Sequence, residues 1–556
     1  MFRTLTALLL TVTIPTSTLA QNMVLTNAVI DTVVRGQPMA EALAIDDDGI
    51  IIAVGSEQEV LAIAGDEARI IDLDGMMVLP GFQDAHMHLI EAGVNQILCE
   101  FEPFADLDAT LDTVAECVDS SETDWVLGSG VSMVNRLDQT DDPIALLDEI
   151  SPDRPVLILD DIGHGAWANS VAMQAAGYDT LDGNPPGGII LRRADGRPNG
   201  VVLENAQQKL RNLAFPDTPE NVQFAYENML PMLQTMAENG ITSVSDAGGF
   251  WPQGHVKVWQ MALDQDTLTV RASNALYVYP DLPFDEQIAA LRALYSNDPG
   301  SLLRFNQAKL YVDGILEQRT GAMLDPYLPG EGIDHGFTSG FEYFGAEMLN
   351  RYSVALADLG FQLHYHVTGD RGARMALDAI ALADPAPGPH RLTHIYTLDK
   401  ADYPRFQQLG VVADFQLAPS SLDPEYNDFI RGFIGDRADR MMPAGALKAL
   451  GVDVVMSSDF DADELSPLVK IQAAVERPKD GAPDVQTAIE WMTINPARLL
   501  HQDDMTGTIE VGKFADLVVI GQDITDIPVH QIESATVAAT LLQGEVVFDA
   551  EGLFGE

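Results

Sequence analysis

The sequence predicts an α/β fold, a (β/α)8 barrel joined to a small β-sandwich domain. Through the middle of the chain, short apolar and β-branched runs alternate with longer segments of helical period, which is typical of a parallel sheet or barrel. Both ends of the chain instead consist of short strands joined by turns. The length of 556 residues also exceeds one compact core of ordinary size, which favours a large barrel or several domains.

The first twenty residues, "MFRTLTALLLTVTIPTSTLA", have the order of a secretory signal peptide. One positive charge at Arg3 precedes an apolar stretch, and small residues end the segment at Ala20. A membrane anchor is the alternative, but the apolar stretch is about half of the ~20 residues that a spanning helix needs. We therefore expect a signal peptide over 1–20, a periplasmic or secreted protein, and no stable membrane insertion after its removal.

The two β-rich ends, residues 21–79 and 505–556, are expected to form one β-sandwich domain. In "ALAIDDDGIIIAVG" an acidic turn is followed by an apolar run, which predicts a hairpin. The C-terminal stretches "GTIEVGKFADLVVIGQDI" and "VAATLLQGEVVF" have the same character. Strands from both termini therefore make up one small unit.

Residues 80–504 are assigned to the barrel. The gap between the first two candidate strands, from about 90 to 240, is far longer than the ~30 residues of one βα unit, so it holds an inserted subdomain at about 95–215. The candidate barrel strands are "VLPGFQDAHMH", "GITSVSDAG", "RASNALYVY", "FNQAKLYVDG", "FQLHYHVTGD", "HRLTHIY", "GVVADFQL" and "DVVMSSDFD".

Charge and cysteine content limit the partners. The 31 basic and 84 acidic residues give a net charge of −53, which argues against a nucleic-acid partner and for a solvated, self-repelling surface. The expected partner is a small-molecule substrate. A homodimer is compatible with the sequence. In an exported chain the only two cysteines, Cys99 and Cys117, could form a disulfide, and two buried thiols are the alternative.

Histidines mark the predicted barrel mouth. His86 and His88 lie two apart on a strand, so they share a face and could bind a divalent metal, although this pattern alone is weak and also fits core or solvated histidines. Other candidates end predicted strands, where the active sites of such barrels lie. They are His364, His366, His394 and Asp459.

Lys309 lies within the predicted strand "FNQAKLYVDG". A lysine on a buried strand is costly unless its amine is neutralised, paired or chemically modified. Two explanations therefore stay open, a pair with Asp313 and a covalent change of the amine.

The sequence resembles the amidohydrolase superfamily of metal-dependent hydrolases, and within it the amidohydrolase-3 (YtcJ-like) branch, over essentially the whole mature chain. The motifs that carry the resemblance are "LPGFQDAHMHL", "LILDDIGHGAWANSVAM", "PPGGIILRRADGRPNGVVLENA", "GITSVSDAG", "KLYVDGILEQRTGAML", "HYHVTGDRGARMAL", "HRLTHIYTLD", "VVMSSDF", "TINPARLL" and "GTIEVGKFADLVVI".

The resemblance implies one or two divalent metal ions, with zinc expected. His86 and His88 would bind the more buried metal, with Asp459 completing its site. His366 and His394 would bind the second, and a carbamylated Lys309 would bridge the two.

Further residues are expected near the substrate. His364 has no assured role: it would lie behind a ligand or line the pocket. In the insertion, His164, with Trp167 and Asn169, could face the substrate or be structural. Asp313 and Arg319 are the remaining pocket candidates.

These features predict an exported enzyme that hydrolyses a C–N bond, most simply an exocyclic amide of the N-acyl or N-formyl kind. Divalent ions lower the pKa of water toward about 7 and polarise a carbonyl, and Asp459 could pass the proton to the leaving group. Ester or lactone hydrolysis, isomerisation and dehydration are alternatives, because a fold does not fix a function. A non-catalytic periplasmic binding protein is a remote alternative.

The chain departs from the family pattern around the pocket. Thr393 stands where a glutamate commonly precedes the sixth-strand histidine. The stretches "GILEQRTGAML" and "SSDFDADELSP" also differ from the usual ones. None of these changes touches a proposed ligand, but a relative's substrate cannot be carried over.

Overall fold

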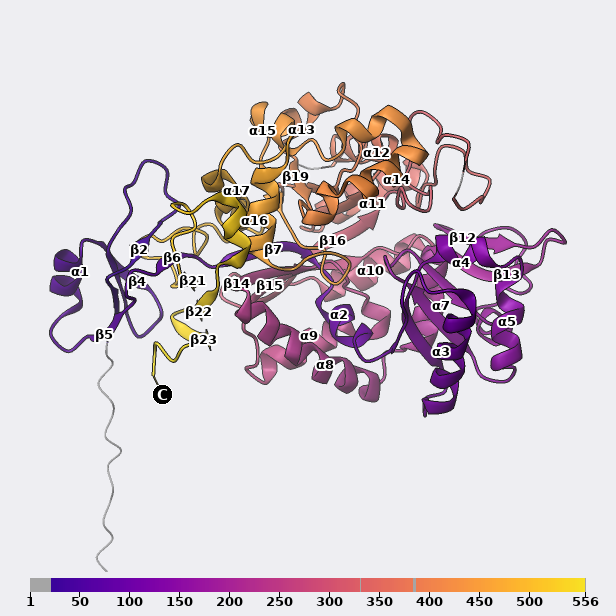
Figure 1. The fold of residues 1–556 in the computed structure, drawn as a ribbon, viewed down its shortest axis with the longest axis horizontal. Helices are drawn as coiled ribbons and strands as arrows, with labels where there is room; N and C mark the ends of the chain where they lie inside the picture. The colour runs from indigo at the N-terminus through magenta and orange to yellow at the C-terminus, as the bar shows by residue number, and fades with distance from the viewer. Residues whose placement is uncertain (1–21, 331, 384–386, 556) are drawn as a thin grey trace, which may run out of the picture.

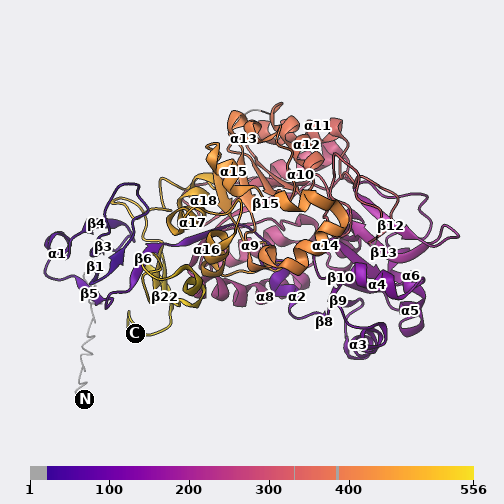
Figure 2. The same cartoon turned by 45° about the horizontal axis from the view of Figure 1, so that its top comes forward.

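The computed structural model describes residues 22–330, 332–383 and 387–555, and the predicted signal peptide over 1–20 lies outside them. Three parts follow one another along the long axis (Figure 1, Figure 2). A small β unit that contains both ends of the described chain lies at one end, the barrel in the middle and the inserted subdomain at the other end. Among the described residues no helix combines the length and the apolar character needed to cross a membrane.

The barrel is one sheet of eight strands in the order β20-β19-β18-β17-β16-β15-β14-β7, and every neighbouring pair is parallel. The chain after β20 returns to the first strand, where the Asp459 amide donates to the His86 carbonyl at 2.8 Å. The predicted barrel is therefore confirmed. Its strands are β7 (Phe82–Met87), β14 (Ile241–Asp246), β15 (Arg271–Tyr277), β16 (Leu303–Tyr311), β17 (Gln362–Val367), β18 (Arg391–His394), β19 (Val412–Phe415) and β20 (Val454–Met456).

Helices cover the outside of the barrel, and α8 shows why. Its buried residues recur at the three- and four-residue spacing of an amphipathic helix, and Thr218 caps its start by accepting from the Asn221 amide at 3.2 Å. The helices after the insertion are α8 (Pro219–Glu238), α9 (His255–Asp264), α10 (Phe284–Leu294), α11 (Ala346–Asp358), α12 (Asp370–Ile380), α13 (Tyr403–Leu409), α14 (Pro424–Ile434), α15 (Ala444–Ala449), α16 (Pro467–Glu476), α17 (Val485–Met492) and α18 (Ile494–Leu499), with 3-10 turns η1 (Trp251–Gln253), η2 (Pro419–Leu422), η3 (Gly435–Arg440) and η4 (Val529–Ser534).

The small β unit is built from both ends of the chain, as predicted. One sheet runs β4-β3-β1-β5 and the other β2-β6-β21-β22-β23, and they share a buried core that includes Leu25, Val78 and Leu541. The predicted acidic hairpin joins β3 to β4. The elements are β1 (Met23–Thr26), β2 (Val29–Ile30), β3 (Ala42–Ile45), β4 (Ile51–Gly55), α1 (Glu57–Ala64), β5 (Arg69–Asp72), β6 (Met77–Pro80), β21 (Leu517–Ile520), β22 (Val537–Leu542) and β23 (Glu545–Asp549).

The predicted first barrel strand, "VLPGFQDAHMH", is divided at Gly81. β6 before it pairs with β21 in the small unit, and only β7 after it belongs to the barrel. A Cβ on Gly81 would lie 2.2 Å from Thr242 Oγ1, so only glycine allows this close passage. The prediction was wrong for the residues before Gly81, because both halves are apolar strands and share one sequence pattern.

The insertion after β7 is a six-stranded sheet in the order β12-β13-β11-β10-β9-β8, flanked by helices. Cys99 and Cys117 form a disulfide that joins β8 to α3, so of the two options the disulfide is present. The elements are α2 (Leu89–Asn95), β8 (Cys99–Glu100), α3 (Leu107–Ser120), β9 (Val126–Val131), α4 (Met133–Gln139), α5 (Pro143–Ile150), β10 (Val156–Asp160), β11 (Gly165–Ala168), α6 (Ser170–Ala175), β12 (Gly188–Arg192), β13 (Pro198–Glu204) and α7 (Asn205–Ala214).

Candidate metal centre

The predicted metal ligands come from different barrel strands and meet at the carboxyl end of the sheet. Each lies in the second half of a strand or directly after it, where side chains face the mouth of a parallel barrel. They are His86 on β7, His88 after it, Lys309 on β16, His366 on β17, His394 at the end of β18 and Asp459 after β20.

Asp459 is the common neighbour of three histidines. Its Oδ1 lies 3.1 Å from His86 Nε2 and 3.4 Å from His88 Nε2, and its Oδ2 lies 3.8 Å from His394 Nδ1. The ring of His366 follows, with its centroid 4.4 Å from that of His394. His86, His394 and Asp459 each place one ligand atom within 4.8 Å of the others, which is close enough to share one ion.

Two of these residues have strained backbones. His394 and Asp459 have φ angles of 76° and 57°, in the left-handed region that few residues other than glycine adopt. Positive φ angles also occur in turns of this chain, for example at Asp74 and Asp266, whereas at a functional site the surrounding fold enforces the strain. Here it accompanies two of the side chains that face the centre.

In three of the histidine rings, one nitrogen is hydrogen-bonded to a protein group and the other is available to a metal. His88 Nδ1 donates to Glu91 Oε2 and His394 Nδ1 to Gln416 Oε1, both at 2.8 Å, so in the neutral ring each Nε2 has the lone pair that a metal requires. His366 Nε2 donates to the Gly314 carbonyl at 3.3 Å, and its buried Nδ1 has no partner among the described residues. A metal ion would give this unpaired nitrogen a partner, so the residues at the barrel mouth are suited to bind a metal.

Charge states also suit a metal. Burial lowers the pKa of His86 and of His366 well below the ordinary range and that of His394 to about 3, which favours the neutral rings that metal ligands must be. His88 differs, because its two carboxylate neighbours outweigh burial and raise its pKa to about 10, so this ring must lose a proton when a metal binds. Burial raises the pKa of Asp459, but its contacts with His86, His394 and His88 hold that pKa well below its usual value. Asp459 is therefore a carboxylate.

Lys309 is fully buried among these groups. Its Nζ lies 3.1 Å from His86 Nε2, and burial lowers its pKa to about 7. The alternative pair with Asp313 is wrong. The Asp313 carboxylate accepts backbone N–H groups from Ala322 at 2.7 Å, Gly369 at 2.8 Å and Thr368 at 3.0 Å, and so anchors two loops instead.

His364 lies behind His86 and does not line the pocket. Its Nε2 is 2.8 Å from His86 Nδ1, and its Nδ1 accepts from Arg391 NH2 at 2.7 Å. Arg391 is also fully buried and donates to Gln307 Oε1 at 2.6 Å. Of the two options for His364, the structure supports the one behind a ligand, where it fixes the His86 ring.

His164 reaches the centre from the insertion, in the turn between β10 and β11. Its ring centroid is 5.0 Å from that of His366, and its Nδ1 donates to Glu204 Oε2 at 2.7 Å. Glu204 has a φ of 59° and also accepts from Thr320 Oγ1 and, at 2.6 Å, from Tyr343 Oη. Glu204 thereby ties the insertion to the barrel loops and orients His164.

The structure places the other pocket candidates away from the centre. Trp167 is fully buried in the insertion core beneath the Arg136 guanidinium, and Asn169 binds the backbone of its own subdomain. Arg319 donates to the Leu328 carbonyl at 3.3 Å and stacks on Tyr327. With Asp313, these residues shape the loops and the insertion and do not line a cavity at the centre.

Three residues of the site were missed from the sequence. Glu91 follows His88 by three positions in a helix, a spacing that brings side chains together and could have identified it. Gln416 ends the predicted strand "GVVADFQL", which was also a usable signal. Glu204 is 40 positions from His164, and nothing local in the sequence indicates the pair.

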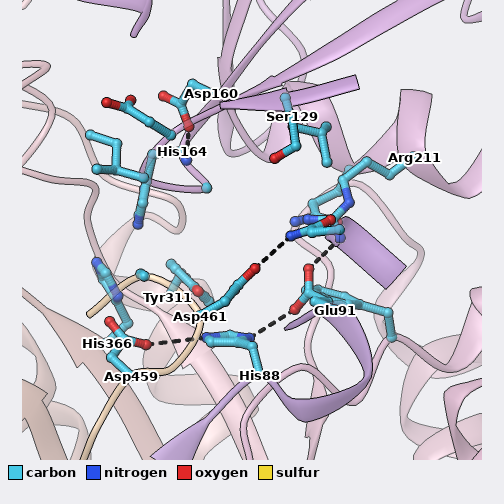
Figure 3. Close-up of a pocket in the computed structure, with 18 of the residues that line it drawn as sticks. His88, Glu91, Ser129, Asp160, His164, Arg211, Tyr311, His366, Asp459 and Asp461 are labelled. Carbon is cyan, nitrogen blue, oxygen red and sulfur yellow. Dashed lines mark hydrogen bonds and ion pairs between the residues drawn. The ribbon is translucent and has the colours of Figure 1, made fainter. Parts of the chain in front are cut away.

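Two cavities flank the centre, and both are lined by His164, His366, His394 and Asp459. The insertion-side cavity, of about 100 Å³, is also lined by Arg211, Tyr311 and Asp461 (Figure 3). Asp161 and Gln208 line it as well. The loop-side cavity, of about 240 Å³, is also lined by Ile315, Glu317, Tyr396, Tyr426, Met442 and Asp463. A substrate bound at the centre can therefore extend to either side.

The family model described as "Amidohydrolase family" matches residues 69–548. The chain belongs to the amidohydrolase family. The predicted resemblance is confirmed, and the chain is a hydrolase of a metal-dependent superfamily. The fold, with its barrel mouth of histidines and carboxylates, agrees with this membership.

Individual relatives are similar over nearly their whole length. The putative amidohydrolase YtcJ of Bacillus subtilis is 27% identical over 531 residues, which cover 90% of this chain and 95% of the relative. The N-substituted formamide deformylase of Arthrobacter pascens is 26% identical over 566 residues, 96% of this chain and 99% of the relative. An uncharacterised metal-dependent hydrolase from Pyrococcus horikoshii OT3 has a similar fold, with a TM-score of 0.70 and 20% identity over 92% of this chain and 99% of its own.

Proposed function

We propose that this amidohydrolase cleaves the C–N bond of an exocyclic amide, of the N-acyl or N-formyl kind. The observation that carries the proposal is the convergence of histidine rings on ionised Asp459 at the barrel mouth. The likeness to a deformylase of N-substituted formamides over 96% of the chain supports the choice of an amide.

The proposed cofactor is zinc, held by His86, His88, His366, His394 and Asp459. Nitrogen and carboxylate ligands suit zinc, which would lower the pKa of water and polarise the scissile carbonyl. We propose two ions with a carbamylated Lys309 between them. In support, burial keeps the Lys309 amine near a pKa of about 7, so a large neutral fraction is available at neutral pH to react with carbon dioxide.

Within the chain, we assign the proton transfer to Asp459. It is ionised and faces both cavities, so it can take a proton from the attacking water and give it to the leaving nitrogen. His164 lies across the centre from the barrel strands, and Glu204 fixes its Nδ1, so its Nε2 is left to contact the substrate. The insertion thus closes one side of the reaction space.

We also propose that the protein is exported, through a signal peptide over residues 1–20. The disulfide between Cys99 and Cys117 supports this, because such bonds persist mainly in oxidising compartments. Identification of the mature N-terminus by mass spectrometry, in a host that exports the chain, tests it. A mature protein that still begins at Met1 would contradict export.

The test of the activity compares zinc-loaded protein on matched amides and esters that share one acyl group. Amide hydrolysis is expected, with a large loss in the Asp459→Asn variant. Ester hydrolysis without amide hydrolysis would refute the C–N assignment. Elemental analysis of the purified protein separates both outcomes from a binding protein, for which no bound metal and no turnover are expected.

A further inference from the structure

Two polar side chains of the insertion-side cavity lie on one face of α7. Gln208 and Arg211 are three positions apart, so they are neighbours on the helix surface, and both line the cavity. They are 7% and 6% exposed. Neither belongs to the proposed metal centre.

Each of these side chains has a polar atom without a hydrogen-bond partner. Among the described residues, Gln208 Oε1 accepts no hydrogen bond and Arg211 Nε donates none, although Arg211 NH2 is bound to Glu91 Oε1. Buried polar atoms in proteins are nearly always paired, so an unpaired acceptor and an unpaired donor on one helix face that lines a cavity indicate a ligand. To satisfy both, the ligand group must offer a hydrogen donor to Gln208 Oε1 and an acceptor to Arg211 Nε.

The charges of this cavity select among such groups. Asp161 and Asp461 add carboxylates, while the charge of Arg211 is already matched by Glu91. A substrate carboxylate would meet these acids and would offer Gln208 Oε1 no hydrogen. An ammonium group would satisfy Gln208 but give Arg211 Nε no acceptor. A neutral carboxamide supplies both.

We propose that the insertion-side cavity binds a carboxamide group of the substrate, with its N–H on Gln208 Oε1 and its oxygen on Arg211 Nε. The inference rests on the proposed amide hydrolysis and names its substrate class. His88, His366 and Asp459 line the same cavity, so the bound carboxamide lies close to the scissile bond. The substrate is then a small diamide, of which one amide is cleaved and the other is held.

The experiment uses three N-formyl compounds that differ only in one end group. They are N-formyl-β-alaninamide, N-formyl-β-alanine and N-(3-methylbutyl)formamide, which end in a carboxamide, a carboxylate and an apolar group of the same shape. For zinc-loaded protein, kcat/KM for the carboxamide is expected to exceed each of the others by about tenfold or more, the usual effect of one neutral hydrogen bond and one from a charged donor. A ratio near one overturns the proposal.

Gln208→Met removes the acceptor and keeps the volume, so the ratio of carboxamide to apolar compound should fall by about fivefold, while the contact with Arg211 Nε remains. The matched control is Gln174→Met, an exposed glutamine on α6 of the same subdomain, which should keep the ratio. Equal ratios in the Gln208→Met variant and the unaltered protein would exclude Gln208 as the contact and overturn the proposal.

Binding separates this proposal from the proposed function. If none of the three compounds is hydrolysed, the C–N assignment fails for them, and calorimetry on zinc-loaded protein measures their affinities instead. Tighter binding of the carboxamide, reduced in Gln208→Met, would then support the carboxamide site alone. Equal affinities for all three compounds would overturn it.

Discussion

The carboxylate of Glu91 should determine how tightly the centre binds its metal. Glu91 is buried, its Oε2 accepts from His88 Nδ1 at 2.8 Å, and its Oε1 pairs with Arg211. Burial raises the pKa of Glu91, but Arg211 and His88 lower it to about 2, so the group is ionised. Carboxylates that support a histidine ligand are typically worth about 10–100-fold in metal affinity.

Glu91→Gln keeps an acceptor for His88 but removes the charge. We therefore expect zinc affinity to fall by about tenfold, or about 1.4 kcal/mol. The unmatched charge of buried Arg211 should lower the free energy of unfolding by about 3 kcal/mol. Competition with a chromogenic chelator and urea denaturation measure the two effects.

The matched control is Glu490→Gln, which breaks the pair with Arg35 outside the two cavities of the centre. It should leave zinc affinity unchanged. If folded Glu91→Gln also bound zinc as tightly as the unaltered protein, within about twofold, the contact between Glu91 and His88 would have no role in metal binding. That result would refute the prediction.

Three other predictions follow from buried groups. Asp459→Asn should keep most of the zinc but slow amide turnover by at least about a hundredfold, because the proton acceptor is lost; unchanged kcat would assign the proton to another residue. Lys309→Ala should lose one of two zinc ions and most activity, with partial recovery in added acetate, whereas full activity without acetate would refute the bridge. Burial lowers the pKa of His255 from 6.5 to about 4, so it destabilises the native state as pH falls from 6.5 through 4. His255→Gln should reduce this pH-dependent loss by up to about 3 kcal/mol in urea denaturation at pH 7 and pH 4, and an unchanged loss would contradict the buried neutral ring.

Much of the barrel could be predicted from the sequence because each strand carries its own signal. Parallel strands buried on both faces read as apolar runs, and their carboxyl ends meet whatever the intervening helices do. That rule alone brings His86, His366, His394 and Asp459 together. It failed at Gly81, where two apolar strands of different sheets follow one another without a polar break.

The surroundings of the metal centre were harder to predict, because they depend on contacts between distant segments. His164 and Glu204 are brought together only when the insertion sheet forms. Asp313 was expected to pair with Lys309 because the two are close in sequence, but its carboxylate binds backbone N–H groups of other loops. Arg319 was expected in the pocket, but its guanidinium packs on the ring of Tyr327 instead. The backbone at Arg319 has a φ of 60°. Local sequence patterns identify candidate catalytic residues, but they do not show whether the side chain of a loop residue points into the site.

The central claim is that a metal centre lies at the mouth of the barrel. Diffraction from crystals of the zinc-loaded protein at the zinc absorption edge tests it most directly. Anomalous peaks are expected between His86, His88, His366, His394 and Asp459, with two peaks and extra density beyond Lys309 Nζ if the lysine is carbamylated. Zinc peaks only at other places, with these side chains hydrogen-bonded to one another, would contradict it.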